Sequence, residues 1–264
     1  MEILKSFALQ ILLSVGVLVI FGLLISVCRR AFCRATGRTG NKILLATGIV
    51  GTPIHELSHA LMCLIFGHKI KQIKLYQPSS TDGTLGFVAH SYNKKNIYHQ
   101  IGNFFIGIAP IICGSGVLFL LMHLLTPELS LEMWDSLGYA SDGSVGSYFE
   151  FVGRFLTSLF DASNFANASW WIFIVLAVMI SSHMELSGPD IKSGAIGFSF
   201  IAILLLIFDA LLYLISPYVL DSVTSAMVSF ALPVAGFLTI SVIFLLILLI
   251  FALIVKGIAS LFKK

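Results

Sequence analysis

The sequence has very few charged residues for its length. Of its 264 residues, only 11% are Asp, Glu, Lys or Arg, whereas 58% are hydrophobic. A water-soluble domain carries about 25% charged residues, so this chain has too few charges to cover a surface that faces water. The composition disfavours a soluble enzyme, a disordered regulator and a coiled coil. It favours a protein embedded in a lipid bilayer.

Clustered basic residues and paired cysteines are also lacking. The net charge of +3 comes from cations that are scattered among predicted loops, with no basic stripe that alternates with aromatic residues. We therefore expect no nucleic-acid partner. The cysteines have no paired metal spacing, and most lie within or beside apolar runs, so we interpret them as packing residues. They are Cys28, Cys33, Cys63 and Cys113.

Long apolar runs, in contrast, are frequent. Six of them are interpreted as transmembrane helices. They cover residues 7–28, 43–66, 101–125, 170–180, 195–215 and 230–255. No internal repeat or low-complexity linker interrupts the pattern, so we interpret residues 1–264 as one transmembrane domain. The predicted fold class is an all-α polytopic membrane protein of about six transmembrane helices, with a small β-hairpin after the second.

The hairpin is predicted from the polar segment 67–100. Apolar and polar residues alternate around Ile73 and Leu75, Asp82-Gly83 is a turn signal, and a second short apolar stretch follows. Alternation on both sides of a turn signal is typical of two antiparallel strands.

The charges of the connectors predict how the spans are oriented. The segment 126–169 has six acidic residues and a single Arg, which places it outside, whereas the lysine-rich hairpin and both termini would lie inside. The five cations of segment 29–42 would then face outside, so the orientation of the first helical hairpin is left open. We expect a multi-pass protein of the cell membrane, with its active site towards the cytoplasmic side.

A polar cluster inside the second apolar run carries the chemistry. Residues 55–59 read His-Glu-Leu-Ser-His, which is the HExxH pattern. In a helix, His55 and His59 lie on one face about one turn apart, so both imidazoles can bind one ion, with Glu56 beside them. One zinc ion with three protein ligands retains a position for water, and an adjacent carboxylate can accept that water's proton. The pattern predicts peptide-bond hydrolysis. A hydrogen-bonded structural cluster is the alternative, which the cost of polar groups in hydrocarbon disfavours.

The third zinc ligand must come from elsewhere in the chain. Asp190 follows the helix-breaking pair Gly188-Pro189, so we expect its carboxylate to project from irregular backbone, which is tolerated at membrane depth only beside a cavity or within protein. We favour Asp190 over His183, which is then the alternative ligand or a residue that supports a ligand. Two other acidic residues are less suited to this ion, Glu185 as a solvated helix-end charge and Asp209 because of its depth.

Two further residues after the motif are excluded as ligands of the same ion. Cys63 lies eight residues beyond His55, about 12 Å along a helix axis. His68 is farther still, and we interpret it as a cap of the helix end.

These residues resemble the site-2 protease family of intramembrane zinc metalloproteases. The resemblance covers approximately residues 43–191, and its specific motif is the HExxH sequence. It also includes Phe66-Gly67-His68-Lys69-Ile70, the strand around Ile73 to Leu75, Ala109-Pro110 and Pro189-Asp190. The chain departs from the family in two places, since Gly188 and Ile191 flank Pro189-Asp190 and Cys113 stands where the family has an asparagine.

The resemblance implies roles for particular residues. His55, His59 and Asp190 would bind zinc, and Glu56 would activate water. A β-hairpin would pair with the unwound substrate. The candidate substrate-binding residues are Ile73, Leu75 and Asn103.

The leading hypothesis is an intramembrane zinc metalloendopeptidase that cleaves membrane-anchored protein substrates within the lipid bilayer. The alternatives are a metal-binding membrane transporter or sensor, and an inactive relative that acts as a binding partner. Glu56 separates these functions, because a transporter needs ligands and a path but no general base.

Overall fold

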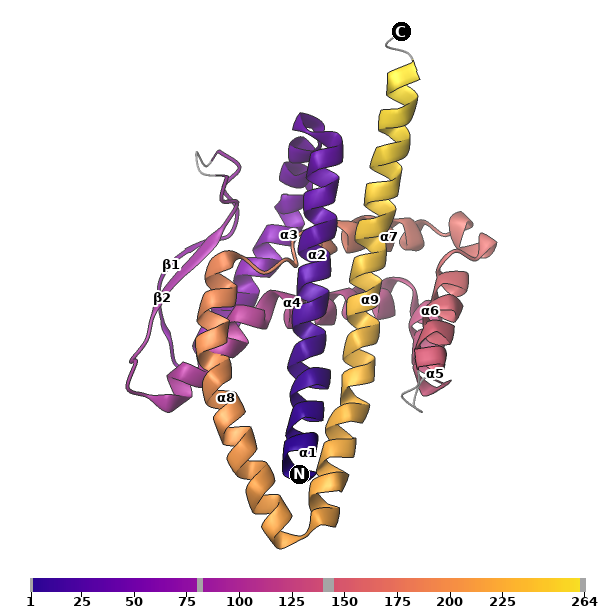
Figure 1. Ribbon diagram of the computed structural model, residues 1–264. Helices are drawn as coiled ribbons and strands as arrows, with labels where there is room; N and C mark the ends of the chain where they lie inside the picture. The colour runs from indigo at the N-terminus through magenta and orange to yellow at the C-terminus, as the bar shows by residue number, and fades with distance from the viewer. Residues whose placement is uncertain (1, 80–82, 140–144, 262–264) are drawn as a thin grey trace.

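Long apolar helices make up most of the protein, with one β-hairpin at the side (Figure 1). The computed structural model describes residues 2–79, 83–139 and 145–261. A π-helical turn (Leu12–Gly16) joins the first two helices, and a 3-10 turn (Ala162–Ala166) precedes the seventh. The helices are α1 (Glu2–Ile11), α2 (Val17–Thr36), α3 (Arg38–Ile65), α4 (Ile97–Leu125), α5 (Pro127–Tyr139), α6 (Val145–Leu159), α7 (Ala168–Ser181), α8 (Gly188–Ile215) and α9 (Pro217–Leu261).

The helices form two sets that cross one another. In Figure 1, α2 and α9 run side by side through the middle of the view, and α8 descends to meet the start of α9 at the bottom. Helices α4 and α7 pass behind this pair and pack against α9. The hairpin lies at one side of the molecule and α5 with α6 at the other. A continuous apolar core joins α2, α4, α5, α6, α7 and α9.

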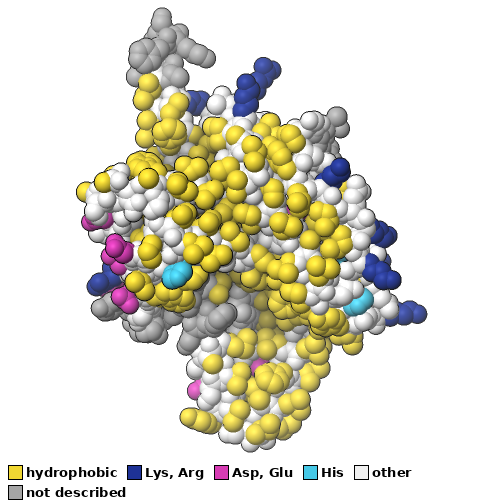
Figure 2. All heavy atoms as spheres, turned by 180° about the vertical axis from the view of Figure 1, so that it is seen from behind, with side chains coloured by type: hydrophobic (Ala, Val, Ile, Leu, Met, Phe, Trp, Pro, Cys, Tyr) yellow, Lys and Arg dark blue, Asp and Glu magenta, His cyan; other side chains and the backbone are white. Residues whose placement is uncertain are grey.

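Within the described residues, four helical segments are long and apolar enough to cross a membrane. They are Glu2–Thr36, Ile97–Leu125, Gly188–Ile215 and Val234–Ile258. Hydrophobic side chains cover the centre of the face shown in Figure 2, while the Lys and Arg side chains lie mostly towards its edges. These features agree with a membrane protein.

The prediction of six spans is not confirmed. The run 170–180 lies in α7, which has only 14 residues, whereas a helix needs about 20 to cross the hydrocarbon core. The run 43–66 lies in α3, whose hydropathy is lowered by the polar residues from Thr52 to His59. The polar side chains that predict a catalytic site therefore lower the mean hydropathy of the helix that carries them.

Helix α3 is continuous through Pro53. It begins at Arg38, after Gly37 in a positive-φ conformation (φ 55°). The proline nitrogen cannot donate a helical hydrogen bond to the carbonyl of Ile49, but the helix does not end there. The HExxH residues thus lie in the second half of a 28-residue helix.

The predicted β-hairpin is confirmed. Strand β1 (Lys69–Lys74) pairs antiparallel with β2 (Phe87–Ser91), and the register shifts between Ile70 and Gln72. Asp82 of the predicted turn lies outside the described residues, whereas Gly83 adopts φ 77°. Beyond β1, the Tyr76 hydroxyl donates a 2.6 Å hydrogen bond to the carbonyl of Leu45 in α3. The hairpin is therefore fastened to the helix that carries the HExxH motif.

Candidate metal centre

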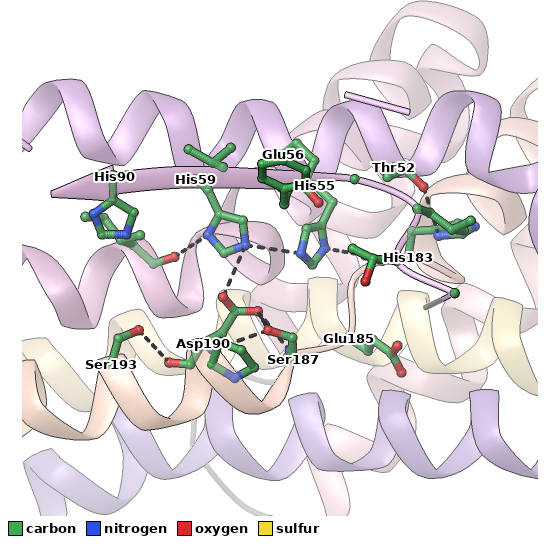
Figure 3. A pocket seen from close by; sticks show the side chains of 18 of the residues that line it. Thr52, His55, Glu56, His59, His90, His183, Glu185, Ser187, Asp190 and Ser193 are labelled. Atoms are coloured by element: carbon green, nitrogen blue, oxygen red, sulfur yellow. Dashed lines mark hydrogen bonds and ion pairs between the residues drawn. The ribbon is translucent and has the colours of Figure 1, made fainter. Parts of the chain in front are cut away.

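Two imidazoles from successive turns of α3 face one another across the site (Figure 3). The Nε2 atoms of His55 and His59 lie 3.1 Å apart. The Nδ1 atom of His55 lies 2.6 Å from the carbonyl oxygen of His183, and the Nδ1 atom of His59 lies 2.7 Å from that of Ile106. Carbonyls of two other segments thus fix the orientation of both rings.

Asp190 approaches the two imidazoles from α8 (Figure 3). Its Oδ1 atom lies 3.4 Å from Nε2 of His59. Its Oδ2 atom accepts hydrogen bonds from the backbone N–H (2.9 Å) and the hydroxyl (2.5 Å) of Ser187. Since the serine holds one carboxylate oxygen, the other is directed towards the histidines.

Asp190 lies in regular helix, which corrects our expectation of irregular backbone. Ser187 is the N-cap of α8 and forms a capping box with Asp190. Proline is well tolerated in the first turn, where its missing N–H costs no hydrogen bond. The Gly188-Pro189 pair therefore begins a helix here rather than breaking one.

Glycines allow α8 to approach α4 closely enough to bring Asp190 to α3. A Cβ atom on Gly107 would lie 2.6 Å from the carbonyl oxygen of Asp190, and one on Gly197 would lie 2.3 Å from the backbone nitrogen of Phe104. Neither distance is possible for a real side chain, so these positions require glycine as long as the helices keep this spacing.

The hydrogen bonds of the site determine where its protons are. A carbonyl oxygen only accepts, so the Nδ1 atoms of His55 and His59 donate to the carbonyls, and in the neutral imidazoles both Nε2 atoms present lone pairs. The Oδ1 atom of Asp190 is a third acceptor beside them. Three acceptors that face each other without a proton repel, whereas a cation between them is stabilised by all three. The residues present therefore fit a zinc ion, with the carbonyl-oriented imidazoles typical of zinc ligands.

Glu56 lies beside this group and lines the same cavity of about 580 Å³. The hairpin passes directly over it. A Cβ atom on Gly86 would lie 2.8 Å from three atoms, namely Cγ of Glu56, Cγ2 of Thr52 and the carbonyl oxygen of Lys74. The absence of a side chain at position 86 lets the chain entering β2 come close to the carboxylate.

His183 and Glu185 are also placed at the cavity. The His183 ring contacts the hydroxyls of Thr47 (3.0 Å) and Thr52 (3.4 Å), and the residue meets His55 through its carbonyl oxygen rather than its ring. Glu185 forms an ion pair with Arg29 of α2. Our interpretation of Glu185 as a solvated helix-end charge is therefore wrong.

Asp209 is remote from the metal-binding group. It is fully buried farther along α8, where its Oδ1 atom accepts a 3.1 Å hydrogen bond from Gln10. The structure thus brings together His55, His59 and Asp190, with Glu56 and the carbonyl of His183 around them, and leaves Asp209 elsewhere.

The three candidate substrate-binding residues lie outside the cavity lining. Ile73 and Leu75, in and just after β1, are 39% and 38% exposed. Asn103 is buried on α4, where its side-chain nitrogen donates a 3.3 Å hydrogen bond to Gln100. From the hairpin, the lining comes instead from residues 83–88 and from His90.

Sequence reasoning missed three residues of the site. Ser187 has a readable signal, since a serine three residues before an aspartate at a helix start is a capping box. His90 directly follows the apolar residues Phe87, Val88 and Ala89 of β2, and its position in the sequence does not indicate what it covers. Burial and the neighbouring His68 ring lower the pKa of His90, so its imidazole is neutral at pH 7. Arg29 lies far away in sequence and has no local signal.

Comparison with known families supports a peptidase-like centre. Residues 48–141 match the model of a family described as "Putative zincin peptidase". The matched region contains the HExxH motif, the hairpin and α4, and it ends before Asp190. No curated protein and no solved structure matches the chain. The similarity supports a zinc metallopeptidase-like family in general rather than the site-2 protease family in particular.

Proposed function

We propose that the protein is an intramembrane zinc peptidase that hydrolyses peptide bonds of membrane-anchored proteins. One observation carries this proposal: the Nε2 atoms of two histidines and a carboxylate oxygen face each other beside a glutamate, at a cavity among apolar helices. The family match supports the peptidase part, and the four apolar helices support the membrane part.

The residues around the cavity have separate roles in hydrolysis. His55, His59 and Asp190 would hold a zinc ion, which would supply Lewis-acid activation of a water molecule and of the scissile carbonyl. A carboxylate oxygen of Glu56 accepts the proton of the attacking water and then delivers it to the leaving nitrogen. The carbonyls of His183 and Ile106 keep both rings oriented during these steps.

The hairpin supplies the surface on which a substrate would be held. A transmembrane helix keeps its backbone in internal hydrogen bonds, so a peptidase must unwind it and offer new partners, as an exposed strand edge does. Residues 83–88, which lead into and begin β2, line the cavity. We place the unwound segment along this edge, next to Glu56. Ile73 and Leu75 would contact parts of the substrate outside the cavity.

The charge of the hairpin supports a cytoplasmic position for the site. Three lysines lie on β1, at positions 69, 71 and 74, and two more follow β2 at positions 94 and 95. Basic residues next to membrane spans are enriched on the cytoplasmic side. We therefore place the cavity towards the cytoplasmic face of the cell membrane.

Glu56→Gln tests the catalytic assignment. The full-length protein would be co-expressed with single-span reporter proteins, and cleaved fragments would be measured together with the zinc content of the purified chain. We expect wild-type protein to produce a fragment and Glu56→Gln to lose it, with a rate lower by about 100-fold or more. Its zinc content should not change, because Glu56 is not among the ligands.

Glu150→Gln is the matched control, since Glu150 is exposed on α6 and pairs only with Arg154 among the described residues. It should cleave like the wild type. Unchanged cleavage by Glu56→Gln would remove Glu56 as the base. Zinc binding without cleavage of any reporter would favour a metal transporter, a sensor or an inactive relative.

A further inference from the structure

A second group of metal-binding side chains lies at the end of α3. Cys63 of α3, His68 from the turn after it and His90 of β2 each offer one ligand atom, and these atoms lie within 4.8 Å of one another. Cys63 is fully buried, and His68 is 4% exposed. We propose that these three residues bind a second zinc ion, which fastens the hairpin to α3 beside the catalytic cavity.

The hydrogen bonds of His68 direct a lone pair into this group. Its Nε2 atom lies 2.9 Å from the carbonyl oxygen of His99, so Nε2 carries the ring proton and Nδ1 is unprotonated. The Nδ1 atom of His90 lies 3.0 Å away, on the other side of the same point. Tetrahedral zinc holds two nitrogen ligands about 3.3 Å apart, so both rings are close to the spacing that a shared ion requires.

The chemistry of the donor set selects the ion. One thiolate and two imidazoles suit zinc, whereas magnesium and calcium prefer oxygen ligands. A fourth position on the ion would be open to water. The His68 ring is held flat against Tyr92, with ring centroids 4.8 Å apart, so the imidazole is already oriented. Cys63 is therefore more than the packing residue that its place in an apolar run indicated.

The second group is separate from the first and shares no residue with it. Cys63 follows His59 by four residues, which is about 6 Å along the helix axis. His90 stands between the groups, because it belongs to the second and also lines the cavity of the first. An ion at Cys63 would fix the position of β2 relative to Glu56.

The proposed ion would add to the contacts that already hold both strands of the hairpin against α3. An isolated two-stranded sheet is marginally stable in water, and this one has no third strand among the described residues. The hydrogen bond from Tyr76 to Leu45 fastens the chain just beyond β1. The proposed ion would fasten the opposite end, where Lys69 pairs with Ser91.

Cobalt substitution of the purified full-length protein tests this proposal. A cobalt ion bound to a thiolate gives a charge-transfer absorption in the near ultraviolet, which an ion bound by histidines and a carboxylate does not give. We expect two ions per chain and this absorption in the wild type. Cys63→Ser should lose the absorption, and His90→Ala should lose one ion per chain. Cys33→Ser, a half-buried cysteine of α2, is the control that should keep both.

His55→Ala separates this proposal from the proposed function. It should lose one ion but keep the thiolate absorption, because the second group does not include His55. Wild-type protein without the absorption, or Cys63→Ser protein that retains it, would overturn the second site while leaving the peptidase proposal intact. If Cys63→Ser does not fold, His90→Ala decides: an unchanged ion count and absorption would overturn the proposal.

Discussion

Two aspartates of α8 have different roles because their partners differ. Asp190 lies in the first turn, where Ser187 binds one of its oxygens and the other faces His59 at the cavity. Asp209 lies 19 residues later, fully buried against α1 and α9, where Gln10 donates to it and also to Thr224. Oδ1 of Asp190 faces an acceptor nitrogen at a cavity, whereas Oδ1 of Asp209 accepts a hydrogen bond within the protein.

The comparison shows how to distinguish a ligand from a structural polar group in a membrane protein. Burial does not distinguish a metal ligand from a structural polar group, since Asp209 is the more buried of the two aspartates. The two roles are distinguished by the balance of hydrogen-bond donors and acceptors around each carboxylate. Around Asp190, two imidazole nitrogens and a carboxylate oxygen converge on one point, which suits a cation, whereas the group around Asp209 includes the amide protons of Gln10 and the hydroxyl of Thr224.

Replacing each aspartate by alanine should give the largest difference in zinc content and in cleavage between two variants. Asp190→Ala should lose the zinc of the first site and reduce cleavage to background, because only two ligands remain. Asp209→Ala should keep zinc and cleavage but unfold more easily, by about 1–3 kcal/mol, since it removes an acceptor of Gln10. Zinc content, cleavage and thermal unfolding would be measured on both. Zinc retained by Asp190→Ala and lost by Asp209→Ala would reverse our assignment.

Removing the serine that holds Asp190 should have an intermediate effect. Ser187→Ala removes the hydroxyl bond to the carboxylate and the N-cap of α8. Zinc affinity should fall by about 10-fold, as when an outer partner of a metal ligand is lost. Competition with a chelator of known affinity would measure it. Ser199→Ala, at an exposed position of the same helix, should leave the affinity unchanged. Equal affinities for the two variants would mean that Ser187 does not position Asp190.

Of these variants, Asp209→Asn should have the smallest effect on cleavage and on thermal stability. Asparagine keeps an oxygen for Gln10 and removes the charge of a buried carboxyl whose Oδ2 atom has no hydrogen-bond partner among the described residues. We expect unchanged cleavage and a thermal midpoint within about 3 °C of the wild type. A loss of cleavage would show that the carboxylate itself is needed, and the comparison with Asp190 would then fail.

The sequence predicts those features of the site that depend on residues close together along the chain. The four-residue spacing of His55 and His59 fixes both on one face of a helix, and the structure places their Nε2 atoms 3.1 Å apart. The alternation around residue 73 predicts the hairpin that the structure contains. The pair Gly188-Pro189 points to Asp190 as a helix break would, although in the structure the pair forms the start of α8.

The parts that depend on packing could not be predicted. Which strand of the hairpin lines the cavity is decided by how the hairpin docks on α3, and alternation along a strand carries no information on docking. The ion pair of Arg29 with Glu185 joins residues far apart in the chain. The six predicted spans are not all confirmed, because counting apolar runs takes no account of helix length and α7 has only 14 residues.

Zinc-edge X-ray absorption of the Cys63→Ser protein tests the central claim most directly, because this variant should retain only the ion of the first site. We predict a first shell of nitrogen and oxygen atoms, with the outer scattering of two imidazole rings and a carboxylate. A protein without zinc, or a shell that contains sulfur, would contradict the account.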